Sequence, residues 1–446
     1  MSTTYMITII LIAVVAMIYA ITKMKTHAFL ALLIVSILLG LVAGFAPTEI
    51  IKMVESGFGS ILGSVGIIVL TGGIIGTMLQ KSGAALVIAN TILGWVGEKH
   101  SAMAMAIAGY ITGVPLFCNS GYVVLAPVAK AISVKSKVSM AVIASAMSAG
   151  LFTTHCFVPL HPGTLAIANS FGANFGILLV LGLIVSIPGT IAGVIYGQKV
   201  SSKIEIEAKN EVNKEGIVKT YGKLPGKLHS FLPIISIILL VALKTVADLE
   251  SAPFGTGTVK WIFSLVGNPE VALIIGMFIS MTLISGEDKK KVSAYINEGI
   301  GSSVGMLAII GAGGSFGAVL QALPLADKIS VLTMNPMLGV FVPFLIAAFF
   351  KTVMGATTVV QVLAASITLP MLTSLGLGSE MGCIIAVLAI AAGSMVVSHA
   401  NDAYFWIVSE FSGLNTSQAY KAQTGMTLVV GFVSILTIYL LSFIIL

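Results

Sequence analysis

Arginine is absent from the 446-residue sequence, whose 23 Lys and Arg positions are all lysine. Charge of either sign is also scarce, because only 9% of the residues are charged, whereas a soluble domain carries roughly 25%. A chain with so little charge cannot cover a surface that faces water. Since 57% of the residues are hydrophobic and apolar runs near the ~20 residues that cross a bilayer recur along the chain, the sequence predicts an all-α polytopic membrane protein with ten to twelve spans.

Cysteine is the second scarcity. Cys118, Cys156 and Cys383 share no spacing typical of a disulfide framework or a metal site, so no cofactor is expected. The net charge of +6 does not indicate a nucleic-acid partner, because the lysines stand between apolar runs and not in stripes with aromatic residues. The lipid bilayer is the partner that the composition predicts.

Lysines gather in four short segments, which the positive-inside rule predicts to be cytoplasmic. The first apolar run, 6–21, lacks a basic residue before it and is followed by Lys23 and Lys25, which favours a retained span with its amino end outside over a signal peptide. The longest polar segment, 199–229, holds seven lysines and four glutamates. We interpret it as a cytoplasmic linker between an N-terminal half, 1–198, and a C-terminal half, 230–446. The remaining clusters are Lys130, Lys135 and Lys137, and Lys289, Lys290 and Lys291.

An internal repeat supports this division. Residues 72–80 (GGIIGTMLQ) resemble residues 313–321 (GGSFGAVLQ), which follow 241 positions later. Thr154-His155 resembles Ser398-His399 at a distance of 244 positions. Two matches in the same order at nearly the same distance indicate a duplication. Secondary transporters are often built from two such halves, with the substrate at their interface near the bilayer midplane.

The first half carries a polar, helix-breaking segment within the uncharged stretch 138–198. This segment, 153–164 (TTHCFVPLHPGT), contains two prolines and a glycine, which end a continuous helix. Freed backbone groups in a bilayer need protein, water or ligand as partners, and a broken helix offers an N-terminus that favours an anion. His155 and His161 add titratable donors. The alternative is a proline-kinked helix with hydrogen-bonded histidines.

The second half carries an equivalent segment, 398–406 (SHANDAYFW), after the apolar run 381–397. Asp402 is a candidate intramembrane carboxylate, and ionisable residues at that depth are usually functional. Burial disfavours its charged form, which suits a proton carrier. The alternatives are that Asp402 caps a helix beginning at Tyr404, or that it lies at the membrane interface beside Trp406.

Two further polar segments precede these breaks, 113–122 in the first half and 351–358 in the second. Both interrupt apolar runs with small and hydroxyl-bearing residues. We interpret them as tips of re-entrant hairpins that meet the ligand or ion; the alternative is a packing face of small residues. Lys351 either pairs with a substrate carboxylate or snorkels to the membrane interface.

Segments 154–164 and 398–402, with Phe405-Trp406, resemble the gluconate permease family of bacterial symporters, also called the gluconate:proton symporter family. Residues 119–121 and 351–357 match more loosely, and the similarity covers nearly the whole chain. The resemblance implies ion-coupled uptake of a small organic acid across the bacterial inner membrane, typically gluconate, with glycerate and D-serine transported by other members. It also implies two inverted repeats, re-entrant hairpins, a homodimer and elevator-type motion.

The chain departs from the family pattern at the first hairpin tip. Gluconate transporters of the family typically have Phe, a second aromatic residue and Glu-Val-Gly, where this chain has Phe117-Cys118-Asn119-Ser120-Gly121. Asn119 in place of the acidic residue removes a candidate proton site. The proton remains the favoured coupling ion, with Na⁺ held by hydroxyl and carbonyl oxygens as the alternative.

Without arginine, no guanidinium is available to clamp a carboxylate through two parallel hydrogen bonds. We therefore expect helix N-termini, hydroxyl groups, an amide and histidine to hold it. Near-normal uptake by folded variants of Asn119, His155, His161 and Asp402 would contradict this expectation. The predicted ion-coupling residues are His155, Lys351 and Asp402. The predicted substrate-binding residues are Asn119, Ser120, Gly121, Thr154, His155, His161, Gly163, Thr164, Gly355, Thr357, Thr358, His399 and Asn401.

Two other classes of function compete with a symporter. A membrane-embedded metalloenzyme would use His155, His161, His399 and Asp402, but these residues lack the His-x-x-x-His spacing and the neighbouring glutamate of a helical zinc site. A channel would need a pore-lining ring, which the sequence does not suggest. The sequence therefore favours a symporter and not an enzyme, and within that class it leaves sugar acids, short hydroxy acids and D-serine as candidate substrates.

Overall fold

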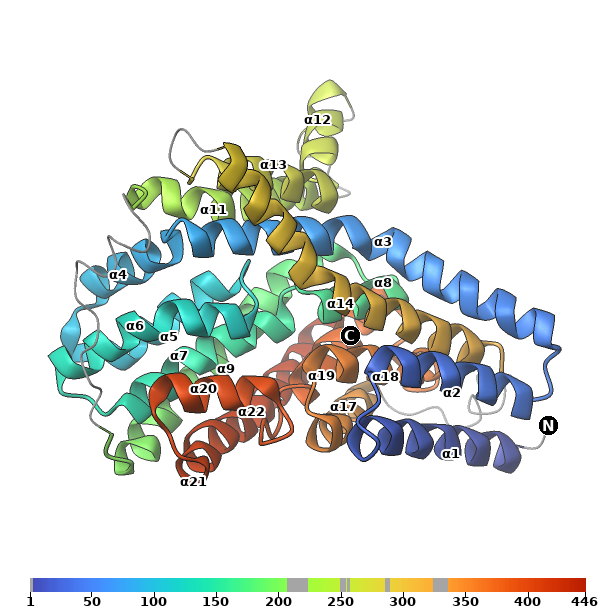
Figure 1. Ribbon diagram of the computed structural model, residues 1–446. Helices are drawn as coiled ribbons and strands as arrows, with labels where there is room; N and C mark the ends of the chain where they lie inside the picture. Colours follow the sequence, from blue (N-terminus) through green and yellow to red (C-terminus); the bar gives the residue numbers. More distant parts are fainter. Residues whose placement is uncertain (1–2, 207–223, 249–253, 255–256, 285–288, 324–335) are drawn as a thin grey trace.

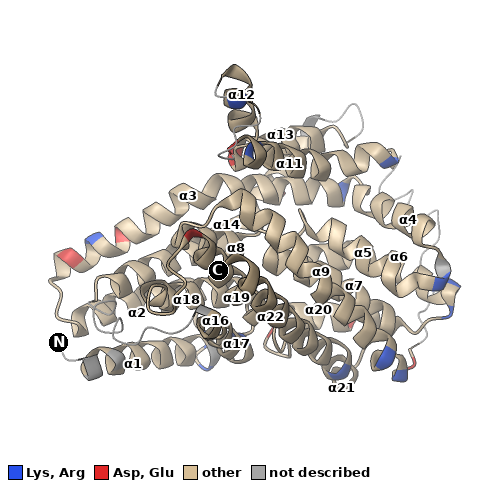
Figure 2. Ribbon diagram, turned by 180° about the vertical axis from the view of Figure 1, so that it is seen from behind, with Lys and Arg blue, Asp and Glu red and all other residues tan. Residues whose placement is uncertain are grey.

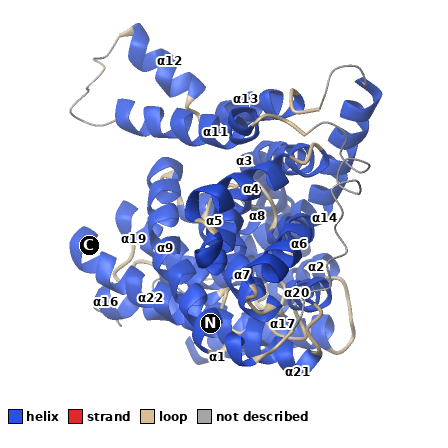
Figure 3. Cartoon of the chain, turned by 90° about the vertical axis from the view of Figure 1, so that its left-hand side faces the viewer, coloured by secondary structure: helices blue, strands red, loops and turns tan. Residues whose placement is uncertain are grey.

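The computed structural model describes residues 3–206, 224–248, 254, 257–284, 289–323 and 336–446, and the regular elements in these ranges are all helices (Figures 1 and 3). Seven of the described helices are long and apolar enough to cross a membrane, or eight if α12 and α13, which are bent by 66°, form one broken span. The sequence predicts ten to twelve spans. The number is lower because six further apolar helices of the described residues are only 10–17 residues long, too short to count as full spans.

The first half of the chain contains the elements from α1 to η2. They are α1 (Thr3–Thr22), α2 (Ala28–Val42), α3 (Pro47–Lys81), α4 (Ala84–Val96), η1 (Glu98–His100), α5 (Ser101–Gly113), α6 (Cys118–Ser136), α7 (Met140–Phe157), α8 (Pro162–Phe171), α9 (Phe175–Lys199) and η2 (Ser201–Lys203). The predicted linker follows α9, and its residues 207–223 lie outside the described part of the chain.

The second half contains the elements from α11 to α22. They are α11 (Lys227–Ala247), α12 (Thr258–Val266), α13 (Pro269–Met281), α14 (Lys289–Gln321), α16 (Pro336–Gly339), α17 (Phe341–Met354), α18 (Thr357–Thr368), η3 (Leu369–Met371), α19 (Glu380–Gly393), α20 (Ala403–Ser412), α21 (Thr416–Ala419), the π-helix η4 (Tyr420–Thr424) and α22 (Gly425–Ile445).

The sequence repeat corresponds to a repeat of backbone features. Gly172 ends α8 with φ 65°, and Gly413, 241 positions later, ends α20 with φ 68°. Both are left-handed helix ends that favour glycine. The next helices, α9 and α21, are capped by Asn174 and Asn415, which are also 241 positions apart. The two halves therefore share local structure as well as sequence.

The equivalent helices α3 and α14 pack along each other at two glycine contacts (Figure 1). Gly57 faces the backbone of Gly314, and Gly73 faces the backbone of Gly299, so closely that a methyl group at any of these four positions would overlap its neighbour. Small residues allow membrane helices to approach in this way. Residue numbers rise along α3 as they fall along α14, so the two helices run antiparallel.

The remaining helices surround this crossed pair. The central helices α7 and α19 are buried along nearly their whole length, α7 between α5 and α9 and α19 between α17 and α22. Helices α11, α12 and α13 form an outer layer above α3 (Figures 1 and 3). Charged residues are few and lie mainly near helix ends (Figure 2). Lys351 and Asp402 also lie at helix ends but differ from the rest, because no other Lys, Asp or Glu of the described residues is buried.

Candidate functional site

Four helices begin within the polar segments that the sequence singles out. Helices α6 and α18 follow the turns 114–117 and 355–356, and α8 and α20 follow the breaks 158–161 and 394–402. Helical order is interrupted at both breaks, and at the first break α7 and α8 still continue as one candidate span, Met140–Phe171. Gly163 at the start of α8 lies against Thr358 at the start of α18, and the rings of Tyr122 in α6 and Tyr404 in α20 are 6.0 Å apart, so N-terminal ends from both halves meet in one buried region. Their N–H groups and dipoles favour a negatively charged ligand.

Lys351 lies in this region with none of its surface exposed. Its Nζ donates to the backbone oxygen of Gly355, to Oγ1 of Thr357 at 2.9 Å and to Oδ2 of Asp402 at 2.7 Å. An ammonium group has three hydrogens to donate, and each of them has an acceptor here. The ring of Phe152 lies 5.2 Å from Nζ and adds a cation–π contact. The alternative that Lys351 snorkels to the interface is therefore wrong.

Asp402 holds the other end of this ion pair and is 5% exposed. Its Oδ2 also accepts a 2.6 Å hydrogen bond from Ser398, and its Oδ1 accepts one of 3.1 Å from the backbone N–H of Tyr404 at the start of α20. Asp402 is thus both a buried carboxylate and a helix cap. Sequence reasoning named Lys351 and Asp402 but not their pairing, because no pattern joins residues that are 51 positions apart.

Two histidines from the first half occupy the same region. The rings of His155 and His161 lie 4.6 Å apart between centroids, and the ring of Phe117 is 6.3 and 5.9 Å from them. Nε2 of His161 is hydrogen-bonded to the backbone oxygen of Gly113 at 2.8 Å. Nδ1 of each histidine is buried and has no hydrogen-bond partner in the described part of the chain. Since buried polar atoms are normally paired, these two nitrogens are free to serve a ligand.

Gln361 lies in α18, which with α17 forms the second predicted hairpin, and it connects this hairpin to both breaks. It was not among the predicted residues. Its Nε2 has two hydrogens, which three acceptors share: the backbone oxygen of Cys156 at 3.3 Å, Oγ1 of Thr164 at 3.4 Å and Oγ of Ser394 at 3.1 Å. Gly163 lies against its amide oxygen, which would overlap a methyl group at that position. A buried glutamine in an otherwise apolar helix such as α18 is the signal that could have identified it.

Three of the four converging helices begin without a capping side chain. Phe117, His161 and Ala356 stand at the N-cap positions of α6, α8 and α18, and none of them bonds the first turn through its side chain. Orphan N–H groups at a helix start need a partner. Other helices have such a cap, for example at Ser139, Asn174, Asn268, Ser379 and Asn415, whereas α4, α5, α11, α12 and α17 also begin without one. The uncapped ends leave N–H groups for the oxygens of a ligand.

The other predicted residues fall into two groups. His399 and Asn401 lie at the exposed edge of the second break, where Nε2 of His399 and Nδ2 of Asn401 bond the backbone oxygen of Thr352 at 2.8 and 3.0 Å. These two bonds fix the end of α17, just before the turn to α18, from its exposed side. Asn119, Ser120 and Thr358 are half-buried, whereas Gly121, Thr154, Thr164, Gly355 and Thr357 are buried.

The structure corrects the alignment of the two breaks. The sequence pairs His155 with His399, yet His155 lies inside α7 and His399 lies outside any helix. The helix boundaries instead place His161 opposite Asp402, at the N-caps of α8 and α20 and 241 positions apart. The shift arises because the second break, 394–402, is longer than the first, 158–161.

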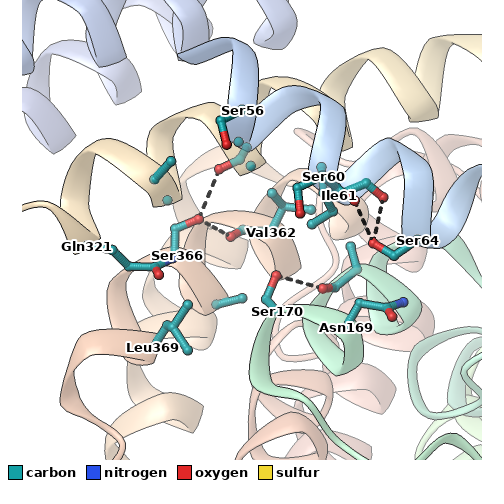
Figure 4. A pocket seen from close by; sticks show the side chains of 17 residues that line it. Ser56, Ser60, Ile61, Ser64, Asn169, Ser170, Gln321, Val362, Ser366 and Leu369 are labelled. Carbon is teal, nitrogen blue, oxygen red and sulfur yellow. Dashed lines mark hydrogen bonds between the residues drawn. The ribbon is translucent and has the colours of Figure 1, made fainter. Parts of the chain in front are cut away.

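A polar cavity of about 310 Å³ lies beside this region, between the crossed helices α3 and α14 and the shorter helices α8 and α18 (Figure 4). Its lining is uncharged, and the sequence did not single it out. Hydroxyl and amide groups enter it from all four helices. They belong to Ser56, Ser60, Ser64, Asn169, Ser170, Gln321 and Ser366. Within the described residues, no group of three or more His, Cys, Asp or Glu side chains is arranged to hold a metal ion.

Comparisons with known proteins agree with this architecture. The fold is similar to the YdaH transporter of Alcanivorax borkumensis, with a TM-score of 0.64 at 14% identity over 93% of this chain and 97% of that one. In sequence, the chain is 31% identical to the gluconate permease of Pseudomonas aeruginosa over 98% of both chains. It is also 31% identical to the D-serine transporter DsdX of Escherichia coli over 99% of both.

The polytopic all-α fold with its broken helices thus defines a membrane transporter. The family model of GntP family permeases matches residues 5–444, and the chain belongs to this family. Its members are permeases and not enzymes. Together with its apolar helices, family membership makes the chain a multi-pass protein of the bacterial inner membrane.

Proposed function

We propose that the chain is a secondary active symporter that imports a small organic acid together with an ion, and that the acid's carboxylate binds where the four helix starts meet. The observation that carries this proposal is Lys351, a fully buried cation beside the uncapped start of α18. In a chain without arginine, this lysine is the one cation of the described residues that is buried at the site. A fixed positive charge next to free N–H groups is suited to a carboxylate.

The names of the relatives support a hydroxy acid as the substrate. Gluconate and D-serine, which name two of them, share a carboxylate and at least one hydroxyl group. The serine-rich cavity next to α8 and α18 offers uncharged donors and acceptors that match a chain of hydroxyl groups. We therefore place sugar acids such as gluconate first, short hydroxy acids such as glycerate beside them, and D-serine as the alternative.

For the coupling ion we favour a proton, with Asp402 as its carrier and His155 as a second titratable group. Asp402 is the buried carboxylate of the site, and isolated buried charges are strongly disfavoured. Asn119, which replaces the family's acidic residue at the first hairpin tip, is half-buried and accepts only a weak 3.7 Å bond from Cys118. Asn119 therefore leaves Asp402 and His155 to carry the coupling. Na⁺ coupling remains the alternative outcome.

Purified protein in proteoliposomes tests this function. A panel of labelled gluconate, glycerate and D-serine is offered with an inward proton gradient, an inward Na⁺ gradient or neither. We expect saturable accumulation of a sugar acid that the proton gradient drives. Accumulation of D-serine alone would replace the substrate, and dependence on Na⁺ alone would replace the ion. No gradient-driven uptake of any acid would contradict the proposal as a whole.

The resemblance further predicts a homodimer, inverted repeats and elevator-type motion. The antiparallel packing of α3 and α14, which occupy equivalent places in the two halves, supports the inversion. Dimer formation and elevator motion stay predictions. The mass of the purified protein after subtraction of detergent and lipid tests the first. Cross-linking of single-cysteine pairs between α3 and α8 in the presence and absence of substrate tests the second.

A further inference from the structure

We infer that the transported carboxylate and Asp402 compete for the same hydrogen of Lys351, and that Asp402 takes up a proton when the substrate displaces it. This inference rests on the proposed function and adds a mechanism by which anion and proton are coupled.

Saturation of Lys351 is the first step of the argument. Its three donated bonds go to Gly355, Thr357 and Asp402, and an ammonium has no fourth hydrogen. The acceptors on Gly355 and Thr357 belong to the same hairpin as Lys351, whereas Asp402 belongs to the break before α20. An incoming carboxylate that binds Lys351 must therefore take a position that one of these oxygens holds. We infer that Asp402 is the partner displaced, because it comes from another element and, like the substrate, binds Lys351 through a carboxylate.

Burial supplies the second step. Side-chain exposure is 0% for Lys351 and 7% for Asp402 in the pair, so neither charge has water to replace its partner. The titratable side chains that interact electrostatically with the pair are Cys118 of α6, His155 and Cys156 of α7, and Tyr404 of α20. His155 is the one basic group among these, and it would itself have to take up a proton before it could compensate a displaced carboxylate. A buried carboxylate without a partner is strongly disfavoured and is neutralised by a proton from the aqueous side.

The balance of charge follows directly. Before loading, the ammonium and the carboxylate cancel. After loading, the ammonium and the substrate anion cancel, while a new O–H bond on Asp402 holds the proton that entered. Ser398 and the N–H of Tyr404 remain to hold the displaced side chain. The site is therefore neutral both empty and loaded, and one proton enters with each singly charged anion.

The ion pair also connects the turn between α17 and α18 to the second break, 394–402. Lys351 and Thr357 flank the turn, and Asp402 with its partner Ser398 lies in the break. Gly355 supports this closure, since it adopts φ 79° and lies directly against the backbone of Asn401. When the substrate replaces Asp402 on Lys351, the contact between the α17–α18 turn and the second break is therefore lost. A carrier with neither its substrate nor Asp402 on Lys351 would hold an unpaired buried cation and would not reorient.

Proteoliposomes containing gluconate as the probe test the inference. In the wild-type protein, uptake is expected to bring in one proton per gluconate, read from an internal pH dye, and to be unaffected when valinomycin and K⁺ set the membrane potential. In Asp402→Asn, which keeps the α20 cap but not the charge, exchange of labelled for unlabelled gluconate should persist. Net uptake should fall by about a hundredfold or more, because the empty carrier holds an unpaired charge. Lys351→Gln/Asp402→Asn should lose exchange as well.

Glu410→Gln is the matched control, because it removes an exposed carboxylate from the same helix and should behave as the wild type. If Asp402→Asn shows net uptake or proton influx at the wild-type rate, substrate and Asp402 do not exchange on Lys351. Wild-type uptake that moves net charge across the membrane would also overturn the inference. The wild-type measurements decide the point even if Asp402→Asn fails to fold. The proposed function fails separately, if the wild-type protein exchanges none of the three acids.

Discussion

The two helix breaks of this permease occupy equivalent places in the two halves but contain different chemistry. The first break, 158–161, is short, and His161 at the start of α8 contacts another histidine and Phe117. The second, 394–402, is longer and contains Asp402, which forms an ion pair with Lys351 of α17. Where Asp402 caps α20, His161 leaves α8 uncapped. The first half thus contributes neutral donors and open N–H groups, and the second contributes the charges.

This difference indicates a division of labour after duplication. Two buried ion pairs in one site would double the cost of desolvation, whereas one charged and one neutral break can share a single anion. The four predictions that follow change in turn the ion pair, the packing beside the first break, the start of α18 and the neighbouring cavity, from the largest expected effect to the smallest.

Loss of the ammonium from the charged break should have the largest effect. Lys351→Met leaves Asp402 as a buried, unpaired carboxylate, which is expected to lower the free energy of unfolding by about 3–5 kcal/mol and to abolish uptake. Thermal unfolding in detergent measures the loss. The double variant Lys351→Met/Asp402→Asn should recover most of the stability but no transport. Lys52→Met, at an exposed position of α3, is the control. Equal losses of stability and uptake in Lys351→Met and Lys52→Met would contradict the prediction.

Packing at the neutral break should have the next largest effect. In Gly163→Ala the new methyl group overlaps the amide oxygen of Gln361, so overpacking should cost about 1–3 kcal/mol. Gln361→Ala in the same chain should relieve the overlap, so that the double variant is less destabilised than the sum of the single ones. Gly94→Ala on α4, where nothing lies within 4 Å, should not destabilise. Strict additivity of the two site variants would show that Gly163 and Gln361 do not act together.

An N-cap side chain added at the start of α18 should raise stability while it lowers uptake. Ala356 has an extended N-cap backbone, φ −70° and ψ 105°, so Ala356→Asp should stabilise α18 by roughly 0.5–2 kcal/mol. The same carboxylate would occupy the N–H groups and the cation offered to the substrate and should weaken uptake. Gly226→Asp provides a cap at the start of α11, away from the site. Uptake that is unchanged in Ala356→Asp would argue against a carboxylate at the start of α18.

The smallest effect is expected in the polar cavity beside the breaks. Ser60 lines it from α3 and is exposed, so Ser60→Phe should reduce its volume with a change in stability within about 0.5 kcal/mol, as for other surface positions. Uptake of gluconate should then fall more than uptake of glycerate, which has fewer hydroxyl groups to accommodate. The ratio of the two initial rates is the measurement. A proportional loss for both acids would remove the cavity from the substrate path.

The sequence predicts much of this arrangement and misses its connections. Broken helices follow from proline, glycine and polar residues in apolar runs, and the repeat follows from residues 72–80 and 313–321, since these are local signals. The Lys351–Asp402 pair, the bonds of Gln361 and the alignment of His161 with Asp402 depend on contacts between distant segments. Periodicity carries no information about such contacts, and the unequal lengths of the two breaks misled the alignment of the histidines.

The antiparallel contact of α3 and α14 has a consequence for biogenesis. Two helices of common sequence origin must be inserted into the bilayer in opposite directions, so their orientation has to be set by what flanks them. Glu49, Lys52 and Glu55 lie in the first turns of α3, and three consecutive lysines, 289–291, begin α14. Positive charge is retained on the cytoplasmic side. We therefore expect the second helix to be anchored by its start, and the first, which ends at Lys81 beside Glu298, by its end.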